Sequence, residues 1–473
     1  MDELLKRTAT DVVGMLRKKE VSPVELIEAS LARIEAVEPQ VNALPTVCAD
    51  RALDRARSMR HPAEPGPGYL WGLPVVIKDL ADVEGVRTTY GSPIYADNKP
   101  VRSDLVVQTL EKNGAIVLAK SNTPEFGAGS QTFNEVFGTT RNPWNLSKTV
   151  GGSSGGGAAA LATGEAWIAT GSDLGGSLRN PAAYCSVVGL RPSAGRVAHG
   201  PSGLPFDMLP VDGPMARTVG DVALMLDAMV GQHPHDPLSL MPPAEPFQAA
   251  LSAPERPLRV AFSPDLGIAP VEPEVIEICA AAARKFETLG ATVEEACPDL
   301  TGAAEVFHTL RAYLFATGKE ALLEHRDQLK PEVIWNIEAG LNLSIAELSE
   351  AERQRGVLAE RMATFLDDYD LLLCPAAILP PFDATMRYPE NVAGVHFDSY
   401  IGWLIICAAI TLTGAPAMSV PCGFTKDGLP IGLQIVGKPR GEAALLAAAA
   451  RFEGATGLAQ GVPIDPRPGK AAA

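Results

Sequence analysis

Short apolar runs separated by turns follow one another from about residue 71 onward, with helical stretches between them. Apolar residues recur at helical spacing over residues 221–230 and 274–289, for example. This alternation predicts an α/β fold, a single large domain with a mixed, helix-covered central β-sheet, and continuous apolar runs are typical of strands buried on both faces. The runs predicted as strands are residues 75–77, 116–118, 167–168, 260–262, 371–373, 418–420 and 433–436.

The first 60 residues have a different pattern, in which apolar positions recur at helical spacing. Ser22 is placed to cap a helix, Pro23 suits its first turn, and Glu25 completes a capping box. The apolar positions that follow are Val24, Leu26, Ile27, Leu31 and Ile34. We therefore predict that residues 1–60 form a helical segment packed on a core made by residues 61–473.

A proline-rich connector at residues 234–246 leads into a segment that is mostly helical in pattern from 301 to 350. We predict that residues 240–370 form a helical, cap-like insertion over the core. Such insertions commonly shape the surface that meets a substrate.

Composition and charge narrow the function classes. The chain has 473 residues, and its hydrophobic content of 46% is enough for a large core. The formal net charge of −16 comes without any basic run, which argues against direct binding of nucleic acid or of an anionic membrane. The longest apolar run, residues 401–412, is too short to span a bilayer.

The seven cysteines are odd in number and never spaced as C-x-x-C. This spacing favours reduced, mostly buried thiols and gives no zinc site. The first residues are charged and lack the hydrophobic region of a signal peptide, so we expect a cytoplasmic protein.

Two glycine-rich loops that carry serines dominate the candidate chemistry. The first runs from Thr149 to Gly157, the second from Thr170 to Arg179, and a small-residue segment that reads as a short helix and a strand joins them. A flexible linker is disfavoured because the first loop runs directly into the helix-forming residues 158–162. A phosphate-binding loop is weakly supported because no Lys-Ser or Lys-Thr pair follows at the required spacing. The G-x-S-x-G elbow of α/β-hydrolases also fits around Ser153, but the preceding residues 142–149 are polar and turn-rich rather than a hydrophobic strand.

These residues resemble the amidase signature family of hydrolases. The resemblance rests on Gly-Gly-Ser-Ser-Gly-Gly at 151–156, on Gly-Ser-Asp-Leu-Gly-Gly-Ser-Leu-Arg-Asn-Pro-Ala at 171–182, and on the upstream lysine in Leu-Pro-Val-Val-Ile-Lys-Asp at 73–79. It extends through residues 141–144, 213–216 and 432–437, and it is weakest from about 240 to 370. The resemblance implies an amidase that needs no cofactor or metal.

A serine nucleophile needs a base within hydrogen-bond reach, and Lys78 is the best candidate for that base. None of the seven histidines lies in a glycine-rich setting, whereas Lys78 ends an apolar run that would carry it into the interior. A free lysine with a pKa of ~10.4 is neutral in fewer than about one molecule in a thousand at pH 7, and burial can lower that pKa by ~3–5 units. The neighbouring Asp79 would hold the lysine charged, but strand alternation points it to the opposite face.

The resemblance implies three catalytic roles. Ser177 is the nucleophile, Ser153 is the bridging serine in a cis peptide, and Lys78 is the terminal base. The proton would pass from Ser177 through Ser153 to Lys78 and return to the leaving amine. Ser154 is a candidate supporting hydrogen-bonding residue, although a purely structural role fits it equally well.

The residues just before Ser177 suit the stabilisation of an oxyanion. Consecutive glycines allow a tight turn that presents several N–H groups to one point, and one such donor is worth roughly 3–4 kcal/mol of barrier. We assign this role to the N–H groups of Leu174, Gly175, Gly176 and Ser177. Asp173 and Arg179 flank the turn and are expected to pair and hold it.

The substrate pocket is less well defined by the sequence. In similar enzymes the stretch containing Gly129, Ser130 and Gln131 faces the scissile bond. Apolar or aromatic positions further along, represented by Ile378, Tyr400 and Trp403, suit either the acyl side of a pocket or ordinary core packing. An apolar pocket would favour aliphatic or aryl amides over free glutamine, and the same chemistry could open an ester or a carbamate.

The expected enzyme is an amidase that cleaves the C–N bond of linear carboxylic amides, acting as a monomer or homodimer on a small amide or carbamate. One alternative is the glutaminase subunit of a tRNA-dependent amidotransferase, which shares these motifs and passes its ammonia to a partner that holds the RNA. A second is an α/β-hydrolase that uses Ser153 with a late histidine such as His396. A third is a catalytically silent binding protein, which the presence of all three candidate catalytic side chains disfavours.

Overall fold

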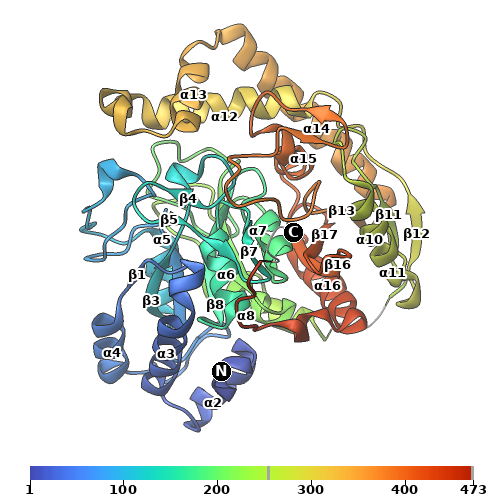
Figure 1. Ribbon diagram of the computed structural model, residues 1–473. Coiled ribbons are helices and arrows are strands. Elements are labelled where there is room, and N and C mark those ends of the chain that lie inside the picture. The colour runs from blue at the N-terminus through green and yellow to red at the C-terminus, as the bar shows by residue number, and fades with distance from the viewer. Residues whose placement is uncertain (253–255, 470–473) are drawn as a thin grey trace.

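The computed structural model describes residues 1–252 and 256–469 of the chain (Figure 1). Within these residues, eleven strands form one mixed sheet in the order β1-β3-β2-β8-β10-β9-β16-β17-β13-β11-β12. The strands of this sheet are β1 (Thr46–Val47), β2 (Pro74–Lys78), β3 (Ile116–Ser121), β8 (Ile168–Asp173), β9 (Val188–Arg191), β10 (Val211–Ala216), β11 (Arg259–Phe262), β12 (Thr292–Glu295), β13 (Leu371–Pro375), β16 (Ala417–Phe424) and β17 (Pro430–Val436).

Parallel and antiparallel pairs alternate in blocks across the sheet. β2 is parallel to both β3 and β8, and β11 is parallel to both β12 and β13. The strands between these blocks pair antiparallel, as does β1 with β3. The predicted mixed sheet is therefore confirmed. Three short hairpins lie outside it: β4 (Phe133–Asn134) with β5 (Gly138–Thr139), β6 (Arg141–Asn142) with β7 (Asn145–Thr149), and β14 (Asn391–Val392) with β15 (Val395–His396).

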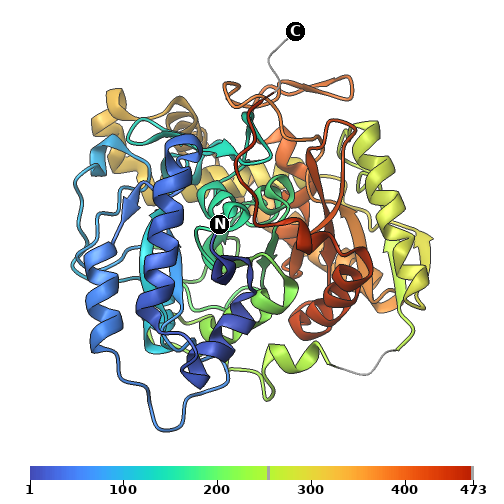
Figure 2. The same ribbon diagram turned by 60° about the horizontal axis from the view of Figure 1, so that its bottom comes forward.

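Helices cover the sheet and both of its ends. Figure 2 shows α3 and α4 at one end of the molecule and α10 and α11 at the other. The helices are α1 (Glu3–Lys6), α2 (Ala9–Lys18), α3 (Pro23–Val41), α4 (Ala49–Ser58), α5 (Leu105–Lys112), α6 (Gly155–Thr163), α7 (Arg179–Cys185), α8 (Val219–Met229), α9 (Phe247–Ala250), α10 (Pro273–Ala283), α11 (Lys285–Thr288), α12 (Ala303–Lys319), α13 (Pro331–Leu341), α14 (Ile345–Asp368), α15 (Ile405–Thr413) and α16 (Glu442–Thr456). Short 3₁₀ turns are η1 (Pro93–Tyr95), η2 (Glu125–Gly127), η3 (Glu320–Gln328), η4 (Gly402–Leu404) and η5 (Leu458–Gly461).

In the N-terminal segment, helix α3 begins where the sequence predicts. Ser22 caps the helix, Pro23 occupies its first turn, and the Glu25 side chain completes the capping box. Residues 46–47 add a feature that helical periodicity could not show, because they form the edge strand β1 of the main sheet.

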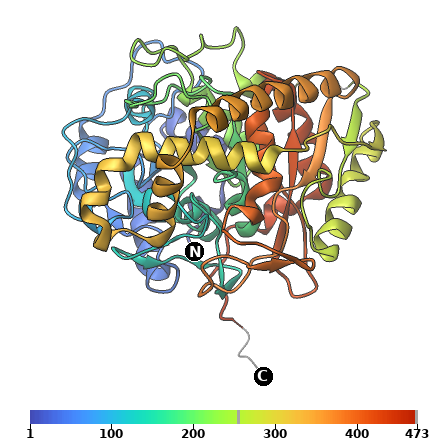
Figure 3. The ribbon, with the colours of Figure 1, turned by 90° about the horizontal axis from the view of Figure 1, so that it is seen from above.

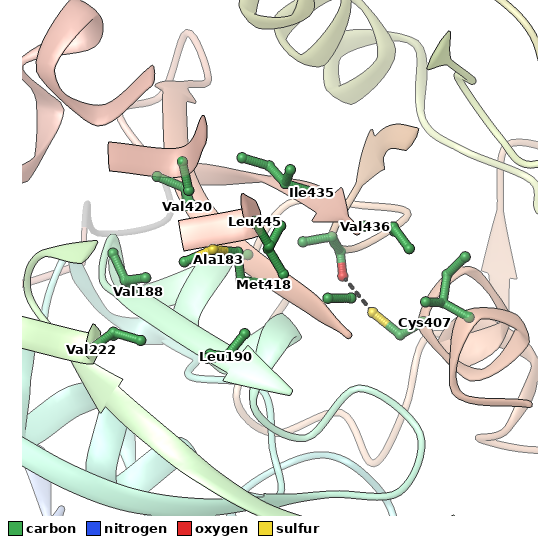
Figure 4. Packing of buried hydrophobic residues seen from close by; sticks show 14 of the residues in the cluster. Ala183, Val188, Leu190, Val222, Cys407, Met418, Val420, Ile435, Val436 and Leu445 are labelled. Atoms are coloured by element: carbon green, nitrogen blue, oxygen red, sulfur yellow. Dashed lines mark hydrogen bonds between the residues drawn. The ribbon is translucent and has the colours of Figure 1, made fainter. Parts of the chain in front are cut away.

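The core lies where helices press on the central strands. Figure 4 shows Val188 and Leu190 of β9 beside Met418 of β16 and Ile435 of β17. Helices α7, α8 and α16 pack against this part of the sheet. All four of these strand residues are fully buried. The alanine- and glycine-rich α6 is buried along its whole length, which explains its lack of a polar face.

The prediction for residues 240–370 needs correction. Strands β11 and β12 fall in this range and extend the main sheet, so the range as a whole is not an insertion. β12 was not predicted, because its sequence Thr-Val-Glu-Glu lies at the sheet edge and is only partly buried. The helices α12 to α14 alone have the character of a cap, and Figure 3 shows α12 in yellow crossing the molecule with the orange helices beside it. Over the described residues, no helix combines the length and apolar character needed to cross a membrane.

Candidate active site

The two glycine-serine loops meet Lys78 at one edge of the sheet. Lys78 is the last residue of β2, and Asp173 is the last residue of β8. Because β2 and β8 are parallel neighbours, their carboxyl ends lie at the same edge. The second loop continues from β8 into α7, and the first loop leads from β7 into α6. Chain segments far apart in sequence thus bring one lysine and several serines together.

Lys78 lies at the centre of a cluster of hydroxyl groups. Its Nζ donates to Ser153 Oγ at 2.7 Å, to Ser154 Oγ at 2.9 Å and to Ser172 Oγ at 2.9 Å. The side chain is buried, with 2% of the residue exposed. The peptide bond between Gly152 and Ser153 is cis. The structure therefore places Lys78, Ser153 and Ser154 in direct contact.

The environment of Lys78 favours the neutral amine. Burial lowers the pKa of Lys78 to about 7, although the carboxylates of Asp212 and Asp173 act to raise it. No carboxylate lies within 4.0 Å of Nζ among the residues of known position. Asp79 points away, as strand alternation predicts, and forms an ion pair with Lys120 at 3.0 Å. A lysine in these surroundings can accept a proton near neutral pH.

Ser177 faces an open cavity that Ser153 also lines. The cavity has a volume of about 510 Å³ and includes Ser130, Leu174 and Gly175 in its wall. Only 7% of Ser177 is exposed, and its hydroxyl makes no hydrogen bond to any residue that the structure describes. The hydroxyl is thus free to meet a substrate.

The turn before Ser177 offers fewer free N–H groups than predicted. The N–H of Gly176 donates to Asp173 Oδ1 at 2.8 Å, so this group is removed from the predicted oxyanion site. Leu174, Gly175 and Ser177 line the cavity, and the N–H groups of all three have no partner in the described part of the chain. Gly176 is required for another reason: its φ is +111°, and a Cβ there would lie 2.6 Å from Cys407.

A buried ion-pair network holds this turn. Asp173 accepts from Arg179 Nη2 at 2.8 Å and from Arg179 Nε at 3.0 Å, and its backbone oxygen accepts from Arg191 Nη1 at 2.5 Å. The N–H of Leu178 donates to the same carboxylate at 3.1 Å. Burial raises the pKa of Asp173, but Arg179, Arg191 and the N–H of Gly176 together outweigh burial and hold that pKa well below its ordinary value. Asp173 and Arg179 thus pair across the turn, as expected.

Only one of the six predicted substrate-binding residues lines the cavity. Ser130 does so, whereas Ile378 and Trp403 are core residues and Trp403 stacks on Tyr184 with ring centroids 6.3 Å apart. Gln131 is turned toward backbone, donating to Ala384 O at 3.1 Å. Gly129 and Tyr400 lie outside the cavity wall as well: Lys330 covers Gly129, and the Tyr400 hydroxyl accepts hydrogen bonds from Arg311. Glycine-rich and aromatic character alone did not separate cavity lining from packing at these positions.

No sequence signal pointed to several residues that do line the cavity. α12 contributes Arg311, Phe315 and Lys319 to the wall. An adjoining cavity of about 580 Å³ contains Lys78, and His199 lines both spaces. These residues come from a helix with no catalytic motif and from loops that the fold brings over the sheet edge.

His199 and Asp212 form an ion pair beside Lys78. The distance from His199 Nδ1 to Asp212 Oδ2 is 2.8 Å, and Asp212 lies opposite Ser172 in the sheet. Burial acts to lower the pKa of His199, but Asp212 outweighs burial and raises that pKa to about 9. The pair therefore adds a charged neighbour to the lysine environment.

The rival base His396 is not near the serines. It lies in β15, on an exposed hairpin, and contacts Asn391 and Asp398. Ser153 instead contacts Lys78, so the geometry of an α/β-hydrolase elbow with His396 is excluded.

Comparison with known proteins agrees with this geometry. A family model described as Amidase matches residues 25–446. The chain is 36% identical over 464 residues to an acylamidase of Rhodococcus erythropolis, covering 97% of each protein. It is 38% identical over 483 residues to a glutamyl-tRNA(Gln) amidotransferase subunit of Moorella thermoacetica, covering 96% of this chain and 97% of that one. It superposes on a bacterial aryl acylamidase with a TM-score of 0.90 at 29% identity, covering 97% of this chain and 99% of that one. These matches cover almost the whole chain and show that it belongs to the amidase signature family.

Proposed function

We propose that the protein hydrolyses the C–N bond of linear carboxylic amides through an acyl-enzyme on Ser177. The observation that carries the proposal is the contact of 2.7 Å between the buried Lys78 Nζ and Ser153 Oγ, because Ser153 lines the same cavity as Ser177. Burial without a contacting carboxylate gives the lysine a pKa of about 7, which suits a general base at neutral pH.

In the first half of the proposed reaction, Ser177 Oγ attacks the carbonyl carbon of the amide. Its proton passes to Ser153 Oγ while the Ser153 proton passes to Lys78 Nζ. The carbonyl oxygen becomes an oxyanion and accepts hydrogen bonds from the N–H groups of Gly175 and Ser177. The C–N bond then breaks, and the departing nitrogen takes the proton back from Lys78 through Ser153.

The second half repeats the proton relay with water. Water gives its proton through Ser153 to Lys78 and attacks the acyl carbon. The bond to Ser177 Oγ breaks, and the proton returns to that oxygen. The products are a carboxylic acid and the free enzyme, and the same steps would cleave an ester or a carbamate.

Two functions compete for this chemistry, because the chain is about equally similar to an acylamidase and to a glutamyl-tRNA(Gln) amidotransferase subunit. The acylamidase function is favoured by the apolar part of the cavity wall, which is formed by Leu80, Phe126, Leu314 and Leu404 and suits the hydrocarbon part of an acyl group. The glutaminase subunit of a tRNA-dependent amidotransferase is the second candidate, supported by the identity of 38% over almost the whole chain.

The test is hydrolysis by the purified chain alone of a short aliphatic amide, an anilide, an aryl carbamate and glutamine. The amidase proposal predicts turnover of the amide or the anilide that is lost in both Ser177→Ala and Lys78→Ala. Ser202→Ala is the matched control, because Ser202 lines the same cavity but makes no contact with Lys78, so this variant should keep most activity. A chain that is inert, or active on glutamine alone, would favour the amidotransferase function and would be retested with partner subunits added.

A further inference from the structure

Arg311 is a buried cation with no anionic partner, and it faces the catalytic cavity. The residue is 6% exposed and lines the cavity wall with Ser177 and Leu404. No carboxylate lies within 4.0 Å of its guanidinium among residues 1–252 and 256–469. Burying a charge without a counter-charge is costly, so such a residue calls for an explanation.

Other buried arginines show how this protein ordinarily compensates such charges. Arg179 pairs with Asp173, Arg196 pairs with Glu442, and Arg33 pairs with Asp465. Arg217 has no carboxylate but donates to the backbone oxygens of two residues. Arg311 has neither a carboxylate nor a backbone oxygen: both of its hydrogen bonds go to one neutral oxygen, and its Cζ lies 4.7 Å from the Phe315 ring centroid and 5.5 Å from that of Tyr400.

That single oxygen belongs to Tyr400, whose hydroxyl accepts from Arg311 Nε at 3.0 Å and from Nη2 at 2.7 Å. A guanidinium has five N–H donors, so three are left over, including both on Nη1. Nη1 makes no hydrogen bond to a described residue and is not among the buried atoms sealed from solvent. Nη1 is therefore reachable by solvent, and Arg311 lines the cavity, so the two N–H groups of Nη1 are the donors available to a ligand.

A second cation on the same helix adds to the positive charge of this wall. Lys319 also lines the cavity, and its Nζ lies 5.3 Å from the Phe126 ring centroid and 5.5 Å from that of Phe315. It too has no carboxylate within 4.0 Å in the described ranges. Of the acidic residues in the wall, Asp173 is engaged by arginines, and Asp207 makes no ion pair with either cation.

The position of Arg311 tells which part of a substrate it meets. In the proposed reaction the leaving nitrogen receives its proton from the Lys78 side. Arg311 lines the cavity that holds Ser177 but not the adjoining one that holds Lys78. We assign the adjoining cavity, which holds Lys78, to the leaving amine, and this assignment places the guanidinium on the acyl side of the scissile bond.

We propose that Arg311 binds a carboxylate carried by the acyl part of the substrate, so that the preferred substrates are monoamides of dicarboxylic acids. This inference rests on the proposed amidase function and names its substrate class. A planar guanidinium can receive a carboxylate through two parallel hydrogen bonds, and a carboxylate bound there would supply the missing counter-charge.

The experiment compares acyl groups of equal length with and without the terminal carboxylate. The monoanilides of succinic, glutaric and adipic acid are paired with the anilides of butyric, valeric and hexanoic acid, and kcat/KM is measured for each. At the best chain length, the wild type should favour the acidic anilide. Arg311→Met should lower kcat/KM for that substrate by roughly 10- to 100-fold, the loss of a charge-assisted hydrogen bond, and change the neutral one less than about threefold.

Two further variants separate recognition from packing. Arg311→Lys keeps the charge but not the paired donors, so it should retain part of the preference. Arg353→Met makes the same exchange at an exposed arginine of α14 and should alter neither substrate. An equal loss on acidic and neutral anilides in Arg311→Met would overturn the inference, because it would show that Arg311 only positions Tyr400. A wild type without preference at any length would overturn it as well.

Calorimetric binding to inactive enzyme keeps this test separate from the proposed amidase function. Ser177→Ala and Ser177→Ala/Arg311→Met are titrated with the acidic anilide that fits best. If the double variant binds this anilide roughly 10- to 100-fold more weakly, the inference is supported even when nothing is turned over. Equal binding to both overturns it, even if amides are hydrolysed.

Discussion

The pH dependence of turnover tests the proposed role of Lys78 most directly. If Lys78 must be neutral to accept the proton of Ser153, then kcat/KM falls as pH drops through the pKa of the lysine. That pKa is lowered by burial to about 7, so the acidic limb should have its midpoint there. Below the midpoint, kcat/KM should fall about tenfold for each pH unit, as for any single essential base.

The gain in the fraction of neutral lysine at pH 7 follows from the buried position of Lys78. At pH 7 a pKa of about 7 leaves half of the lysine neutral. A free lysine with a pKa of ~10.4 would be neutral in only about one molecule in 2,500, so burial supplies roughly a thousandfold more active base. In free energy this difference is ~4–5 kcal/mol, at 1.36 kcal/mol per pKa unit.

The assay is kcat/KM for a neutral anilide from pH 5 to pH 10 (about half-unit steps), under conditions in which the fold is intact. Two other groups near the site titrate in this range and need their own variants. Burial raises the pKa of Asp104 to about 7, and the pKa of His199 is raised to about 9 through Asp212. In Asp104→Asn the acidic limb should stay in place, because Lys78 causes it.

Asp212→Asn supplies the directional test. The Asp212 carboxylate acts to raise the pKa of Lys78, so its removal should move the acidic limb to lower pH. A limb that stays in place in Asp212→Asn but disappears in Asp104→Asn would refute the reasoning. A wild-type limb near the pKa of free lysine would refute it too, because burial would then have no effect on the base.

Two further predictions concern the scaffold that holds the site. Asp173→Asn leaves Arg179 and Arg191 without their carboxylate and should cost about 3–5 kcal/mol of unfolding free energy, measured as a lower urea midpoint. Because the pKa of Asp173 is lowered in the fold, this contribution is present above the ordinary pKa of an aspartate and is lost as pH falls below it, so the variant and the wild type should converge in acid. Gly156→Ala places a Cβ 2.4 Å from Asn122 N and 2.6 Å from Ala43 O, so it should lower the melting temperature. Gly454→Ala lies on the exposed face of α16 with nothing within 4 Å of its Cβ, and it should add about 0.5–1 kcal/mol to the free energy of unfolding. Equal melting temperatures for these two alanine variants would contradict the packing argument.

Local patterns predicted the parts of this fold that local physics determines. The apolar runs became strands, and the capping residues Ser22 and Glu25 began α3 as expected. Strands β9, β10 and β12 were not among the predicted runs. β12 lies at the sheet edge, and none of its four residues is fully buried, so it has no apolar run. Arg311 escaped prediction because nothing in its own helix marks it. The proposed role of Arg311 depends on its surroundings in three dimensions: no carboxylate of the described residues lies within 4.0 Å of it, and it lines the cavity beside α12.

The two buried lysines at this sheet edge also show what local sequence predicts and what only the register of the strands decides. Lys78 and Lys120 lie on adjacent parallel strands, and burial lowers the pKa of both. Lys120 contacts Asp79 at 3.0 Å, whereas Lys78 contacts three hydroxyls. Alternation along β2 showed that Asp79 would point away from Lys78, but only the register of β2 against β3 shows that Asp79 meets Lys120. By pairing with Lys120, that carboxylate is held away from Lys78, which is what the proposed role of Lys78 as a base requires.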